Sequence, residues 1–276
     1  MTLPNSHRTL CLAAALVFSG SSALAQISVI GQLTDDRMVA PGSQYDGTVT
    51  VRNETDVPQE VKVYQTDYFF SFDGTTVYGE PGEAFRSNAH WVSFTPSFID
   101  LDPHASSVVN YTVKVPDSTA GKPVEGSYWS MLMIEGVAPG SPESSKPAQP
   151  DQNRMGISQL IRYGVQIATH IAGTGKIEAR FLDVRVQSEQ DGSRFLVVDI
   201  QNVGDLWFRP TFSAEIFDAS GASKGMFQGT QLRIYPGTSV RQRINLGKIP
   251  RGTYTVMMIL DAGGDDLVGA EYTLTL

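Results

Sequence analysis

The sequence predicts an all-β protein made of two β-sandwich domains in tandem. Valine, isoleucine, threonine and aromatic residues alternate with polar residues along most of the chain, which is the period of strands with one buried face. Turn signals built on glycine, proline, asparagine and aspartate separate these runs. We find no segment with the periodicity of an amphipathic helix. Short strands at such even spacing are typical of immunoglobulin-like sandwiches.

Residues 1–25 have the pattern of a cleavable signal peptide. An apolar run from Leu10 to Phe18 follows the basic Arg8 and precedes the small residues that end at Ala25. The run is shorter than the roughly 20 residues needed to cross a bilayer. We therefore expect an exported protein with no stable membrane insertion. The periplasm is the expected destination, and the cell surface or secretion are the alternatives. Cys11, the single cysteine, lies within this leader.

The charge balance argues against a nucleic-acid partner. The chain has 21 Lys and Arg residues against 29 Asp and Glu residues, a net charge of −8. Loss of the leader would remove Arg8 and make the balance more acidic. Nucleic-acid phosphates require a basic surface.

The first domain is expected to span residues 26–172. Its clearest strand signals are Val49 and Val51 before a turn at Asn53, and the alternation that ends at Val115 before Pro116. Residues 126–135 are apolar on both faces, which predicts a central strand. The expected strands of this domain cover residues 26–33, 47–53, 61–70, 91–101, 107–115, 126–135 and 157–171.

A long loop precedes the last of these strands. Residues 137–155 contain four prolines among glycine, serine and charged residues, and connections of this length inside a domain are usually functional or disordered. The strand that follows has apolar residues at alternate positions, with the row formed by Ile157, Ile161, Tyr163, Val165 and Ile167. The glycines at 173 and 175 mark the predicted domain boundary.

The second domain is expected to span residues 173–276 with about seven strands, as in an immunoglobulin-like sandwich. These strands are predicted at residues 176–186, 194–202, 209–217, 231–235, 239–246, 253–260 and 268–276. Exposed aromatics such as Trp207 and Phe208 could form a groove, although core packing is the more common use of such residues.

Two motifs resemble known families. The stretch from Trp91 to Pro103 places a proline-containing strand before a "leucine, acidic, proline" turn, and the strand 49–53 ends in Asn53. With the order of strand, long loop and alternating strand, this pattern resembles the periplasmic pilus-assembly (fimbrial) chaperones over residues 27–172. It is also similar to Gram-positive surface proteins that join a peptidoglycan-binding sandwich to a host-binding sandwich. A shared fold cannot choose between them.

The chaperone resemblance implies a mechanism. A pilus chaperone lends an edge strand to an incomplete partner subunit, through main-chain hydrogen bonds and alternate apolar side chains. The implied donor strand is the row 157–167, although core packing against the partner sheet of the same domain is the more common use of such a row. The family also holds the partner's terminal carboxylate with two basic residues, one on the first strand and one on the donor strand. Arg162 is placed for the second, whereas residues 26–33 contain no Lys or Arg and Arg37 is the nearest.

The sequence offers no sign of an enzyme, a cofactor or a metal site. His90, His104 and His170 are isolated in sequence and are expected on the surface or in loops. Asp261, with the two aspartates at 265–266, lacks calcium-loop spacing and predicts a polar hairpin. Two functions remain open: a chaperone for protein subunits of a pilus or surface assembly, and a structural or adhesive envelope protein that binds glycan or a surface protein.

Overall fold

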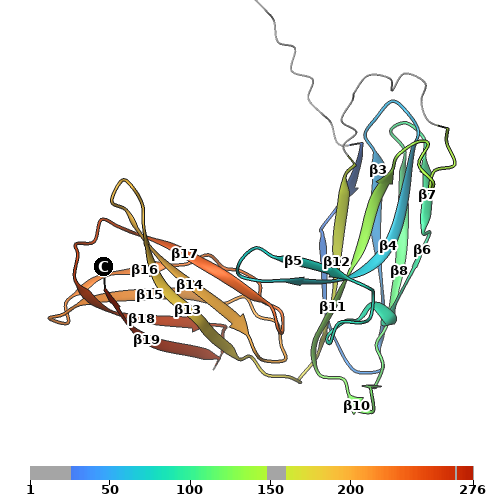
Figure 1. Cartoon of the computed structure of the whole chain (residues 1–276). Coiled ribbons are helices and arrows are strands. Elements are labelled where there is room, and N and C mark those ends of the chain that lie inside the picture. Colours follow the sequence, from blue (N-terminus) through green and yellow to red (C-terminus); the bar gives the residue numbers. More distant parts are fainter. Residues whose placement is uncertain (1–25, 148–159, 265, 276) are drawn as a thin grey trace, which may run out of the picture.

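The computed structural model describes residues 26–147, 160–264 and 266–275 (Figure 1). The predicted signal peptide (residues 1–25) and Ile157 of the predicted donor row lie outside these ranges. The described elements are strands, apart from one short 3-10 helix, η1 (Ala89–Trp91). They form two β-sandwiches in tandem, which meet at an angle in Figure 1. No helix in the described part of the chain is long and apolar enough to span a bilayer.

The first sandwich has two main sheets, and strands β1 to β12 pair only among themselves. The first sheet has the order β1-β3-β8-β6. The second has the order β2-β12-β11-β4-β5, with β7 also paired to β4, and β9 and β10 form a small separate hairpin. The strand bounds are β1 (Ile27–Ile30), β2 (Thr34–Val39), β3 (Gln44–Asn53), β4 (Gln59–Phe70), β5 (Thr76–Gly79), β6 (Val92–Thr95), β7 (Phe98–Leu101), β8 (Ser106–Lys114), β9 (Ser118–Thr119), β10 (Lys122–Pro123), β11 (Gly126–Val137) and β12 (Arg162–Ile171).

Two of the strands predicted from the sequence are each divided in the structure, because the chain crosses from one sheet to the other within them. The expected strand 26–33 ends early, because the chain leaves β1, paired with β3, and enters β2, paired with β12. Gly31 lies between them with a φ of 117°, a value that favours glycine. The expected strand 91–101 is likewise divided into β6 and β7, which belong to opposite sheets. Pro96, between them, has no N–H to donate to a ladder.

Strand β11 is central, as its sequence predicted. It pairs with β12 on one side and with β4 on the other. All of its residues are buried, from Gly126 to Val137. Its inward side chains, among them Leu132 and Ile134, contribute to the core between the two sheets. Its outward side chains include Trp129, which packs with Tyr235 of the second sandwich.

The second sandwich consists of strands β13 to β19. A three-stranded sheet of order β13-β14-β17 faces a four-stranded sheet of order β16-β15-β18-β19. The segment 231–235, expected to be a strand, makes only an isolated bridge between Ile234 and Phe208, and β16 was not expected. The bounds are β13 (Ala179–Ser188), β14 (Arg194–Asn202), β15 (Thr211–Asp218), β16 (Ser223–Gln228), β17 (Ser239–Gly247), β18 (Thr253–Asp261) and β19 (Leu267–Thr275).

The same asparagine motif closes one strand in each sandwich. Asn53 ends β3 and Asn202 ends β14, and both are fully buried. The Oδ1 atom of each accepts a hydrogen bond from the backbone N–H two residues later, and the Nδ2 group of each donates to the carbonyl four residues later. Each Nδ2 group also donates to a more distant carbonyl, that of Asp102 or that of Ile234. The side chain thus shapes its own turn and attaches it to another segment.

Candidate functional site

Strand β12 is the edge of its sheet over part of its length only. It pairs with β11 along Arg162–Ile171. On its other side, β2 pairs with it from Gln166 to Ile171. Within the described residues, the preceding part of β12 has no strand partner on this side. We call residues 160–165 the β12 margin.

The backbone groups of the β12 margin alternate in direction. The N–H of Gly136, on β11, donates to the carbonyl of Ile161 at 3.3 Å, whereas the N–H of Gln166 donates to the carbonyl of Leu33 on the opposite side at 2.9 Å. In an antiparallel ladder every second residue shares a direction. Arg162 and Gly164 therefore direct their N–H and C=O groups away from β11. Such unpaired groups at a sheet edge are a template for a strand of another chain.

The side chains of the predicted donor row become less buried toward the start of β12. Val165 and Ile167 are 2% and 0% exposed and belong to the core of the first sandwich. Tyr163 packs against the edge of that core and donates its hydroxyl to the carbonyl of Ile27 at 3.1 Å. Ile161 is half-buried. The beginning of the row is therefore accessible to a partner, while its end is part of the chain's own core.

Exposed apolar residues border the β12 margin. Leu160 at its start is 46% exposed. Ile30 and Leu33, on the chain that passes from β1 to β2, are 51% and 45% exposed. Tyr163 and Gln166 bond to the first strand and to this crossing segment, so that segment runs beside the margin. Exposed apolar residues next to unpaired backbone groups are typical of an interaction surface.

Arg162 is already paired within its own chain. Its Nε donates to Glu135 Oε2 at 2.6 Å, Tyr64 donates its hydroxyl to the same oxygen at 2.7 Å, and Lys62 Nζ lies 3.6 Å from Oε1. Burial alone would raise the pKa of Glu135, but the hydrogen bonds from Arg162 and Tyr64 outweigh it and hold that pKa below its ordinary value. A partner's carboxylate at Arg162 would compete with Glu135.

The first strand supplies no basic partner for Arg162. Strand β1 has the sequence ISVI. The nearest basic side chain, Arg37, lies on β2 and donates its Nε to Asp35 at 2.7 Å. A carboxylate anchor of the kind implied by the chaperone resemblance therefore stays a prediction for Arg162 alone.

The fold of this chain resembles those of solved chaperones. No protein-family model matches the sequence, and no curated protein is significantly similar to it. The chain resembles the class 5 fimbriae chaperone CfaA at 14% identity and a TM-score of 0.46, over 91% of this chain and 99% of that one. It also resembles a chain of the CsuC–CsuE chaperone–tip adhesion subunit complex from the archaic chaperone-usher Csu pili of Acinetobacter baumannii, at 12% identity and a TM-score of 0.43, over 91% and 99%. A third similar structure is the periplasmic chaperone SfaE, at 11% identity and a TM-score of 0.38, over 91% of this chain and 100% of that one.

These structures belong to the chaperone family that the sequence motifs resemble. A likeness of this degree concerns the fold.

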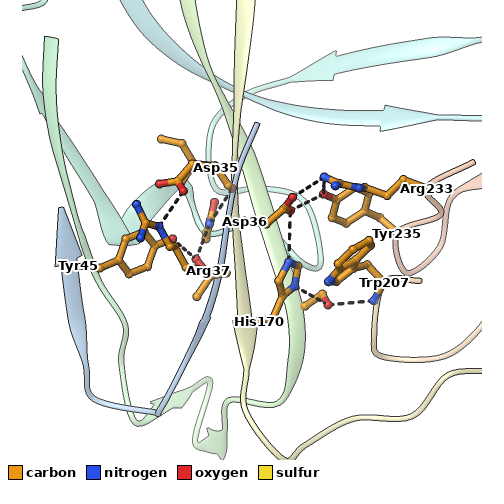
Figure 2. A network of polar contacts seen from close by, with 12 residues as sticks. Asp35, Asp36, Arg37, Tyr45, His170, Trp207, Arg233 and Tyr235 are labelled. Carbon is orange, nitrogen blue, oxygen red and sulfur yellow. Dashed lines mark hydrogen bonds and ion pairs between the residues drawn. The ribbon is translucent and has the colours of Figure 1, made fainter. Parts of the chain in front are cut away.

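A polar network joins the two sandwiches at the other end of β12 (Figure 2). Asp36 of β2 lies 2.7 Å from Arg233 Nη1, 3.3 Å from the hydroxyl of Tyr235 and 3.4 Å from His170 Nε2. The guanidinium of Arg233 also lies over the ring of Trp207, 4.6 Å from its centroid. The carboxylate of one sandwich thus holds the cation of the other, and a cation–π contact supports that cation.

His170 was expected on the surface or in a loop, and this prediction was wrong. It is 3% exposed, lies on β12, and contacts Ser127 Oγ through Nδ1 at 2.9 Å. Ser127 Oγ also accepts the backbone N–H of Trp207 at 2.9 Å. No local sequence signal indicates that His170 is buried, because the groups that contact its imidazole come from β2, β11 and the second sandwich.

We expect Asp36→Asn to lower the free energy of unfolding at pH 7 by about 1–2 kcal/mol, since a quarter-exposed ion pair is partly screened. Burial opposes the shift, but His170 and Arg233 hold the pKa of Asp36 below its ordinary value. A carboxyl group with a lowered pKa stabilises the folded state at pH values above its unfolded-state pKa of about 4. This stabilisation is lost as the pH falls through the lower, folded-state pKa. Urea unfolding at pH 7 and pH 3 should therefore show a smaller difference between variant and wild type at pH 3.

Asp56→Asn is the matched control, because the Asp56 side chain is 97% exposed. Its stability should differ little from wild type at either pH. If the loss of unfolding free energy in Asp36→Asn were larger at pH 3 than at pH 7, it would contradict the predicted stabilising role of the Asp36 carboxylate.

Proposed function

We propose that this protein is an exported chaperone of the fimbrial or pilus-assembly type, which binds an incomplete partner subunit by strand addition at the β12 margin. The observation that carries this proposal is the partial cover of β12, where β2 pairs only from Gln166 onward. Arg162 and Gly164, whose outward backbone groups have no strand partner among the described residues, then present these groups to the partner. The signal-like pattern of residues 1–25 supports export.

Main-chain bonds would supply the affinity and apolar side chains the specificity of such an addition. Ile161 and Tyr163 occupy the accessible half of the predicted donor row, and Leu160, Ile30 and Leu33 add exposed apolar surface. Val165 and Ile167 support the margin from the core. This mechanism requires no catalytic group.

For the alternative, a structural or adhesive envelope protein, Trp207 and Phe208 were the exposed aromatic residues that could form a binding groove. Phe208 is 4% exposed and belongs to the core of the second sandwich. Trp207 packs between the sandwiches, beside His170 and Arg233. Because both rings are already engaged by the chain itself, they do not favour that function.

The test blocks the margin without disturbing the chain's own ladder. Gly164→Pro removes an N–H that points away from β11 and places a ring in the path of an added strand. Gly164→Ala is its control, because it adds the same Cβ, which meets the flexible end of Met131, but keeps the N–H. Each variant is mixed with a pilin-type subunit that lacks its last strand, and complexes are separated by size-exclusion chromatography.

Gly164→Ala should form the complex as wild type does, whereas Gly164→Pro should lose it by at least about tenfold, the equivalent of one or two charge-neutral hydrogen bonds. Circular dichroism verifies that both variants are folded. Equal capture by both variants, or no capture by the wild type, would show that the β12 margin is not the binding site.

A further inference from the structure

A second unpaired margin lies on β3, in the opposite sheet. Strand β3 pairs with β8 along Gln44–Arg52. On its other side β1 covers only Thr50–Asn53, because the chain then leaves for β2. Among the described residues, nothing pairs with the remaining part of β3 on this side. We call residues 44–49 the β3 margin.

The direction of its backbone groups follows from the flanking bonds. The N–H of Val115, next to β8, donates to the carbonyl of Ser43 at 2.9 Å, and the N–H of Glu54 donates to Gln26, next to β1, at 3.1 Å. Odd residues of β3 therefore bond to β8, and even residues point to the β1 side. Gln44, Asp46 and Thr48 are even, and all three are exposed. Their N–H and C=O groups are available to an added strand.

A polar cavity of about 580 Å³ lies beside this margin, lined by residues of β3, β8 and β2 and by Val165 of β12. Asp35, on its wall, is already engaged by Arg37 and by the hydroxyl of Tyr111 at 2.5 Å. Asp46 accepts one hydrogen bond, from the hydroxyl of Thr112, through Oδ1. Its carboxylate is exposed and keeps capacity for a basic group.

We propose that the β3 margin binds an extended basic segment of a partner protein, which pairs with Gln44, Asp46 and Thr48 and places a lysine or arginine in the cavity beside Asp46. The charge of the whole chain, −8, is complementary to such a segment. The contact extends the first sheet, whereas the proposed function extends the second, so the two use different backbone groups, although Val165 of the β12 margin lines the same cavity.

The test uses two synthetic heptapeptides that alternate threonine with lysine or with glutamate. Binding is measured by fluorescence anisotropy, and amide exchange is followed by NMR. The lysine peptide should slow exchange at the amides of Gln44, Asp46 and Thr48, and the glutamate peptide should not. Asp46→Asn should weaken the lysine peptide by about tenfold, because a charge-assisted hydrogen bond is lost.

Thr48→Pro removes an N–H that β8 does not use, so the fold should persist while the peptide is excluded. Gly164→Pro, at the other margin, should leave the lysine peptide's affinity unchanged, which separates this proposal from the proposed function. Unaltered exchange at the three amides, or equal affinity of wild type and Asp46→Asn for the lysine peptide, overturns the proposal.

Discussion

Replacing Asn202 or Asn53 with alanine should lower the free energy of unfolding by about 3 kcal/mol. Each side chain is fully buried and bonds to carbonyls of its own turn and of a distant segment. Alanine would leave several buried polar groups without partners, at roughly 1–3 kcal/mol for each group that water cannot reach. Thermal unfolding followed by circular dichroism should show a midpoint lower by on the order of 10 °C.

Asn110→Ala is the matched control, because Asn110 is also an asparagine on a strand, β8, but its side chain is exposed. Its stability should stay within about 0.5 kcal/mol of wild type. If Asn53→Ala and Asn202→Ala were as stable as the control, the two turns would have to be held by their backbones alone.

Serine substitutions along the donor row should have opposite consequences at its two ends. Val165→Ser should destabilise the protein by about 3–4 kcal/mol, because it removes buried methyl groups and introduces a hydroxyl into the core between the sheets. Ile161→Ser should cost about 1 kcal/mol or less, since Ile161 is only half-buried. Urea unfolding measures both effects.

Only Ile161→Ser therefore reports on partner binding, and it should reduce capture of a strand-deficient subunit in a protein that stays folded. Val165→Ser reports on the core. A Val165→Ser variant as stable as wild type would place that side chain outside the core. An Ile161→Ser variant that captured the subunit normally would exclude Ile161 from the contact.

The fold was largely predictable, and the reason lies in period-two patterning. Strand β14 has the bounds that its alternation predicted, and β11 is central as its two apolar faces indicated. The predictions failed where a strand changes sheet, as at Gly31 and Pro96. Both sides of such a crossing have the same local alternation, because a strand is patterned alike in either sheet.

The candidate site was predictable in its place but not in its extent. The alternating row identified β12, yet Val165 and Ile167 proved to be core and Arg162 proved to be paired with Glu135. The network around Asp36 and His170 had no sequence signal, because its members lie on strands far apart in the chain. Residues 34–39 were not expected to form a strand at all, although β2 decides how much of β12 stays open.

The sequence by itself determined two all-β domains, the acidic charge, the asparagine-ended strands and the alternating strand after the long loop. These follow from local composition and from the two-residue period of a pleated strand. Only the tertiary structure decided which edges are open. One segment, β1 to β2, covers the end of β3 and then the end of β12, and within the described residues the rest of each strand has no partner on that side. Edge pairing depends on backbone hydrogen bonds between segments distant in sequence. The pattern of side chains along one strand does not indicate which segment pairs with its edge.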